Sequence, residues 1–221
     1  MFSYLQVIHI DPSQPAGKVH ELLHRLAEFS ETLPGVRSAK AGTTLPRALN
    51  GGQLMWRLSF STEADYWTCR ASRVWHSKVA PALAPERGLS IDSAAYDVKF
   101  ADTSRQRSTQ RIWRCLMLAL EPHAGAADAR QLERDLMLMP RYIDAIGNWA
   151  LGRAVSSQGR RSWTHVWEQE FDDVQGLEGP YMTHPIHWGL VDAWFDPECP
   201  QRIVDPLLIH AAFAIERSII I

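Results

Sequence analysis

The two halves of this 221-residue chain resemble each other at a nearly constant separation, and this repeat restricts the possible folds more than any other feature. The matching segments are Asp11-Pro12 with Glu121-Pro122 (offset 110), Trp56–Phe60 with Trp167–Phe171 (offset 111), His76 with His187 (offset 111) and Ile91–Ala101 with Val204–Ala214 (offset 113). Because the offset drifts by only three residues, the repeat predicts a tandem duplication of one folding unit.

Hydrophobic periodicity and turn residues predict the same order of elements in each half. The expected elements of the first half are strands at 3–10, 36–43, 53–61 and 90–101 and helices at 16–33 and 63–80. Those of the second half are strands at 112–120, 147–155, 161–171 and 203–214 and helices at 126–139 and 173–194. Each half therefore has the order β-α-β-β-α-β, the ferredoxin-like plan of the α+β class, with helices on one face of a four-stranded antiparallel sheet.

The other face of each sheet needs a cover. In segment 161–171, strand alternation groups Trp163, His165, Trp167 and Phe171 on one side and Thr164, Val166, Glu168 and Glu170 on the other. A bulky face beyond the reach of the helices predicts that the two sheets pack face to face as an α/β barrel within one chain. We expect a first repeat at 1–104, a second at 105–221 and a polar linker at 101–111. A homodimer would then use helices or barrel edges.

Composition excludes several classes of protein. A formal charge of −2 gives no basic surface for nucleic acid. Cys69, Cys115 and Cys199 are widely spaced, which indicates reduced thiols rather than a disulfide framework or a zinc site. The sequence contains neither a signal-like N-terminus nor an apolar run long enough to span a bilayer. We predict a cytoplasmic protein with no membrane partner, no metal and no cofactor.

The segment Tyr181–Gly189 brings a phenol and two imidazoles, those of Tyr181, His184 and His187, within seven residues. Histidine has a pKa near neutrality and tyrosine can donate a hydrogen bond to a carbonyl, so this set suits proton transfer. One alternative is that both histidines only cap and pack a helix. Another is a metal site in which His165 on a neighbouring strand adds a third imidazole, although the sequence places no carboxylate or cysteine with it.

The second half resembles the dimeric α/β-barrel family, also called the stress-responsive A/B barrel, and within it the plant polyketide cyclases. The resemblance rests on Trp163–Phe171, on the pattern Tyr-x-x-His-Pro-x-His-x-Gly in Tyr181–Gly189, and on Ile203–Asp205. Members of that family normally build the barrel from two chains, so this chain would resemble a covalently joined dimer. The resemblance aligns Cys115 with a histidine that the cyclases have on their first strand.

By this resemblance His187 is the catalytic base and Tyr181 assists at the substrate carbonyl, in a pocket between the sheet face and the helices. We expect His184, His165, Trp163, Trp167 and Trp188 to contact a small-molecule substrate, because dense aromatic residues line apolar pockets as well as cores. The predicted function is a cofactor-independent cyclase- or lyase-type enzyme acting on an aromatic or polyketide-like carbonyl compound. The alternative is a non-catalytic stress-related or ligand-binding barrel.

The first half has a degenerate version of this motif. It retains His76 at the position of His187, but Arg70 stands where Tyr181 does and Arg73 where His184 does. We therefore predict one active pocket, in the second half.

Overall fold

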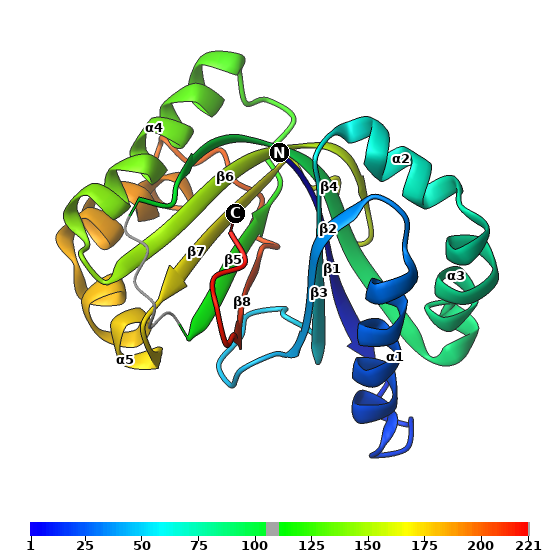
Figure 1. The fold of residues 1–221 in the computed structure, drawn as a ribbon. Helices are drawn as coiled ribbons and strands as arrows, with labels where there is room; N and C mark the ends of the chain where they lie inside the picture. The colour runs from blue at the N-terminus through cyan, green and yellow to red at the C-terminus, as the bar shows by residue number, and fades with distance from the viewer. Residues whose placement is uncertain (105–110, 221) are drawn as a thin grey trace.

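The computed structural model describes residues 1–104 and 111–220, which form one antiparallel sheet flanked by helices (Figure 1). The strands are β1 (Phe2–Ile10), β2 (Val36–Thr43), β3 (Leu54–Phe60), β4 (Leu89–Asp102), β5 (Ile112–Leu118), β6 (Ile146–Gln158), β7 (His165–Phe171) and β8 (Ile209–Ala214). The helices are α1 (Lys18–Thr32), α2 (Glu63–Ala71), α3 (Ala80–Ala82), α4 (Ala126–Tyr142) and α5 (Val174–Gly176). Short π-helical turns are η1 (Trp75–Val79), η3 (Leu177–Tyr181) and η4 (His187–Val191), and 3₁₀ turns are η2 (Pro85–Arg87) and η5 (Asp192–Trp194).

The strand order β2-β3-β1-β4-β6-β7-β5-β8 repeats one four-strand pattern twice. The two patterns are joined edge to edge by antiparallel pairing of β4 with β6. At the opposite edges, the segment after β2 reaches β8, where Leu49 and His210 form a bridge and Leu45 N–H donates to the Ala212 carbonyl at 2.8 Å. The sheet is therefore a nearly closed eight-stranded barrel, which confirms the predicted fold class.

The barrel interior is filled by side chains from both halves. Its apolar core includes Leu5 and Met55 from the first half and Trp113 and Phe213 from the second. Separate apolar clusters lie between the sheet and the helices of each half. Figure 1 shows these helices on opposite outer sides of the barrel, α1 to α3 with the first half and α4 with the second.

The face of β7 that turns inward is opposite to the one expected. Trp167 and Phe171 pack in the cluster under the helices, whereas Val166 lies in the barrel core and Glu168 is fully buried against Arg57. Alternation groups residues by face but does not say which face is inside. Trp163 precedes β7 and packs in the barrel core, apart from Trp167.

Both long helices expected near the ends of the repeats are interrupted. The expected helix 63–80 ends as α2 at Ala71 and resumes in η1, and the expected helix 173–194 is a series of short turns from α5 to η5. Proline lacks a backbone N–H and disfavours helical geometry at the residue before it, and the chain leaves the helix at His184, before Pro185. The last strand is β8 alone, preceded at Val204 by a bridge to Leu120.

The predicted linker falls largely on residues 105–110, which lie outside the described part of the chain. The boundary between repeats at 104 and 105 therefore stays a prediction. In the described ranges, no helix combines the length and apolar character that a membrane crossing requires.

Candidate functional site

Two adjoining cavities lie against the strands of the second half, between the outer face of the sheet and the turns that follow β7. Their volumes are about 520 Å³ and 180 Å³. Both are lined by Arg114 on β5, Met182 after η3 and His210 on β8. The larger cavity has mostly apolar walls, made by Leu45, Pro46, Ala48, Val174, Leu177, Met182, Ala211 and Ala212. The smaller one contains the predicted acid/base pair, Tyr181 and His187.

Tyr181 and His187 contact each other edge to face, with ring centroids 4.9 Å apart. Tyr181 ends the π-helical turn η3 and His187 begins η4, so the break at Pro185 folds the two side chains together. Such π-helical turns are frequent at functional sites. Tyr181 is 2% exposed and its hydroxyl has no hydrogen-bond partner among the described residues. Burial raises its pKa, so the phenol is a neutral hydrogen-bond donor at physiological pH.

Asp192 completes this group. Its Oδ2 lies 3.5 Å from Nδ1 of His187, whose side chain is 13% exposed. A carboxylate beside Nδ1 favours a proton on that nitrogen and leaves a lone pair on Nε2. The sequence pattern did not identify Asp192, although its position five residues after His187 matches the i to i+5 spacing of a π-helix.

Arg114 and His210 form the floor of the site. Arg114 is 3% exposed, stacks on the Tyr181 ring with its Cζ 4.9 Å from the centroid, and donates from Nη1 to Gln169 Oε1 at 2.5 Å. The positive charge of Arg114, with burial and the nearby His187, lowers the pKa of His210 to about 2. His210 is therefore neutral at physiological pH.

The first repeat also contributes to this site. The segment after β2 crosses to β8, and its residues Leu45–Ala48 form one wall of the larger cavity. Arg47 Nη1 contacts Glu178 Oε2 at 3.1 Å across the rim of the cavity. The pocket is consequently shared between repeats, which the repeat pattern alone does not reveal.

Five residues expected to bind substrate line neither cavity. His184 caps the turn after it, since its Nδ1 accepts the Ile186 N–H at 3.2 Å, and Trp188 is 61% exposed. Trp163 and Trp167 are core residues. His165 is bound to Glu133 of α4 (Nε2 to Oε1, 3.3 Å), so it does not join His184 and His187 in the alternative metal site.

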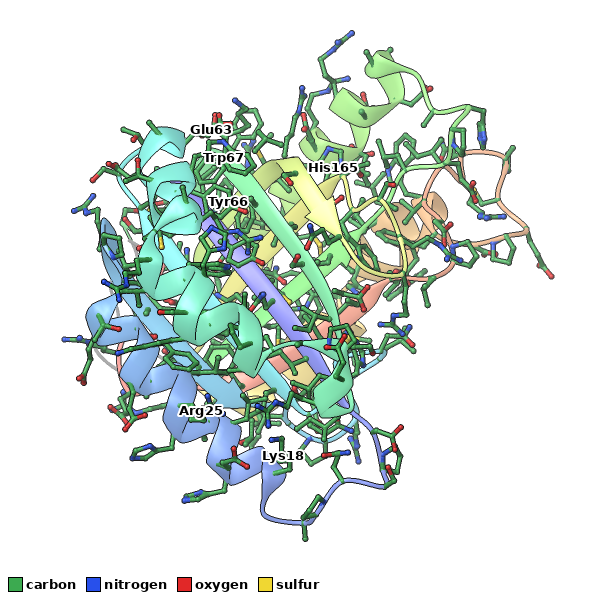
Figure 2. The ribbon with its side chains drawn as sticks, turned by 90° about the vertical axis from the view of Figure 1, so that its right-hand side faces the viewer. Lys18, Arg25, Glu63, Tyr66, Trp67 and His165 are labelled. Atoms are coloured by element: carbon green, nitrogen blue, oxygen red, sulfur yellow. The ribbon has the colours of Figure 1, made fainter. Side chains whose placement is uncertain are left out.

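In Figure 2 the helices of the first half that carry Arg25 and Tyr66 face the viewer, and His165, on β7, lies to one side of them. The described residues include no cluster of three or more histidine, cysteine, aspartate or glutamate side chains suited to a metal.

The corresponding region of the first half is filled. Tyr4 contacts Tyr66 and Trp75 with ring centroids 5.3 Å and 6.0 Å apart, and Arg70 donates to the Tyr4 hydroxyl at 3.2 Å. His76 is exposed. Each half thus has one arginine–tyrosine pair, but the two residue types exchange places. In the first half Tyr4 is on the strand and Arg70 on the helical segment. In the second half Arg114 is on the strand and Tyr181 on the helical segment.

The strand register shows which residue of β5 is equivalent to Tyr4 of β1. Tyr4 pairs with Leu58 and Arg114 with Gln169, so Arg114 is the equivalent of Tyr4 and faces the helices. Cys115 points into the barrel core. Arg114, rather than Cys115, is the side chain that lines both cavities.

Comparison with known proteins agrees with this architecture. Residues 112–205 match the Stress Responsive A/B Barrel Domain family, in line with the resemblance of the second half. No curated protein matches the sequence.

Among solved structures, an anthrone oxidase-like protein is similar at a TM-score of 0.72 and 11% identity, over 96% of this chain and 90% of that one. A proposed monooxygenase from Fusobacterium nucleatum gives 0.58 and 10%, over 97% and 93%. A proposed chlorite dismutase gives 0.56 and 10%, over 97% and 94%. At sequence identities this low, these similarities show a shared fold alone.

Proposed function

We propose that this chain is a cofactor-independent enzyme that moves a proton next to a carbonyl group of an aromatic or polyketide-like compound, in a reaction of the cyclase or lyase type. The observation that carries the proposal is the group formed by Tyr181, His187 and Asp192 at one cavity. A neutral donor and an oriented base side by side are the minimum for enolisation chemistry.

The steps follow from these positions. Nε2 of His187 removes a proton from the carbon beside the substrate carbonyl, and Asp192 stabilises the imidazolium that forms. The Tyr181 hydroxyl donates a hydrogen bond to the carbonyl oxygen, where negative charge develops. In a cyclisation the enolate carbon then attacks a second carbonyl of the same molecule, and the imidazolium returns its proton to the oxygen of that carbonyl.

A non-catalytic binding barrel is the rival, and the capping role of His184 favours it. The two functions differ in proton exchange. We would incubate the protein in D₂O with a benzoylacetyl thioester and follow loss of the α-proton signal by NMR. Acceleration by the wild-type chain that falls about 10²–10⁴-fold in His187→Ala supports the enzyme. Equal exchange in both proteins, with retained ligand binding, supports the rival.

A further inference from the structure

Arg114 is a buried cation without a counterion. Among the described residues no carboxylate lies within ion-pair distance of its guanidinium, and its one hydrogen bond is to the neutral Gln169. Arg57, which is also buried, is instead paired with Glu168 at 2.5 Å. Removing a charge from water is costly unless an opposite charge compensates it, so the state of Arg114 requires an explanation.

The polar atoms left unpaired around Arg114 are nitrogens. Nε of Arg114, Nε2 of Gln169 and Nε2 of His210 are enclosed and have no hydrogen-bond partner. Strand pairing brings them together, because Arg114 lies opposite Gln169 and Leu116 opposite His210. Nη2 of Arg114 also has no partner among the described residues and, unlike Nε, is not sealed off by protein atoms. Nε of Arg114 and Nε2 of Gln169 can only donate a hydrogen bond, and neither has an acceptor.

The two acidic groups at the cavities are already engaged. Asp192 faces His187, and Glu178 contacts Arg47 at the rim. The remaining walls of the larger cavity are apolar and adjoin this floor. The floor therefore suits a negatively charged group of a ligand, and the larger cavity beside it suits an apolar part of the same ligand.

We propose that the substrate of this site is an organic carboxylate whose negative group pairs with Arg114 while its apolar part occupies the larger cavity. The inference deepens the proposed function and rests on the same site, but it concerns binding rather than proton transfer. It places the carboxylate next to Tyr181, whose ring the guanidinium covers. The acid/base pair would then act on a carbon near that head group.

The test compares two probes of the same shape by isothermal titration: 2-naphthoate, which is charged, and 2-naphthamide, which is neutral. We expect wild-type protein to bind the carboxylate about 10- to 100-fold more tightly, the range expected for hydrogen bonds to a charged group. Arg114→Met should abolish this preference while leaving naphthamide affinity unchanged. Arg70→Met, which alters the equivalent pair of the first half, should preserve it. Inorganic phosphate, an anion without an apolar body, should bind weakly.

Equal affinity of wild-type protein for both probes, or no binding of either, overturns the proposal. So does a preference that survives in Arg114→Met, and phosphate binding as tight as that of naphthoate overturns the role of the apolar cavity. If Arg114→Met does not fold, Arg114→Lys supplies the second variant: it keeps the charge and should keep a reduced preference, and an unchanged preference counts against the guanidinium.

His187→Ala separates this inference from the proposed function. We expect it to keep the carboxylate preference even though α-proton exchange is lost. If His187→Ala keeps the carboxylate preference and its α-proton exchange is unchanged, the inference about the carboxylate stands and the proposed enzymatic function is wrong.

Discussion

Arg57 and Glu168 occupy equivalent positions of the two repeats, 111 residues apart, and their side chains meet as an ion pair inside the barrel. Glu168 also accepts hydrogen bonds from the Tyr96 hydroxyl at 2.6 Å and from the Trp113 indole at 2.9 Å. Equivalent positions of the two repeats therefore lie opposite each other at the centre of the barrel. Opposite charges at these positions join the halves where two like charges would repel.

Replacing one partner of this pair should destabilise the fold far more than replacing both. Glu168→Gln leaves Arg57 buried and uncompensated, and we expect a loss of about 3–5 kcal/mol in the free energy of unfolding. The double variant Arg57→Met/Glu168→Leu should lose less than the sum of the two single variants, because no charge is left behind. Denaturant unfolding of the wild type, Arg57→Met, Glu168→Leu and the double variant measures the coupling, and strictly additive losses would show that the pair does not act as a unit.

The site should be functionally asymmetric. His187→Ala should lower turnover about 10²–10⁴-fold with the fold intact, because it removes the base. Tyr181→Phe, which deletes only the hydroxyl, should cost less in the same α-proton exchange assay. His76→Ala is the matched control and should change little, since His76 is exposed and its neighbourhood is filled. Equal losses of turnover in His187→Ala and His76→Ala would mean that both halves contain an active site.

Asp192 should act through His187. Asp192→Asn keeps the shape but weakens the preference for a proton on Nδ1, so kcat should fall about 10- to 100-fold, as for other groups that orient an imidazole. KM should change little, and Asp192→Glu should recover part of the loss. A purely structural role would instead appear as a lower melting temperature with an unaltered pH profile of kcat.

Acid should weaken the contact between repeats at Asp92. Hydrogen bonds from His9 and Arg160 outweigh burial and lower the pKa of this carboxyl from 3.8 to about 2. A lowered folded-state pKa means that the stabilisation is complete above pH 3.8 and is lost as pH falls toward 2. The contribution at neutral pH is on the order of 2 kcal/mol.

Urea unfolding of the wild type at pH 7, 4 and 2 should therefore show a lower free energy of unfolding at pH 2 than at pH 4. Asp92→Asn should not show this decline between pH 4 and pH 2. Asp196→Asn, at an exposed position outside this contact, should behave like the wild type. If Asp92→Asn and wild type lose stability in parallel between pH 4 and pH 2, the contact is not what acid disrupts.

Much of the architecture follows from the sequence. The 110- to 113-residue offset predicts two copies of one unit, and alternation with turn residues places most strands within a few residues of their observed bounds. The Tyr-x-x-His-Pro-x-His-x-Gly pattern identifies Tyr181 and His187, which the structure brings into contact. These features are local, because they depend on spacing along one segment or on comparison of two segments.

The tertiary structure decided what spacing leaves open. The inward face of β7 depends on whether Glu168 finds partners inside the barrel, and those partners, Arg57, Tyr96 and Trp113, come from three other strands. The floor of the site joins Arg114 on β5 to His210 on β8, and its wall comes from the other repeat. Strand pairing and barrel closure alone bring such distant residues together, so no pattern within a single segment could specify the unpaired charge that the site presents.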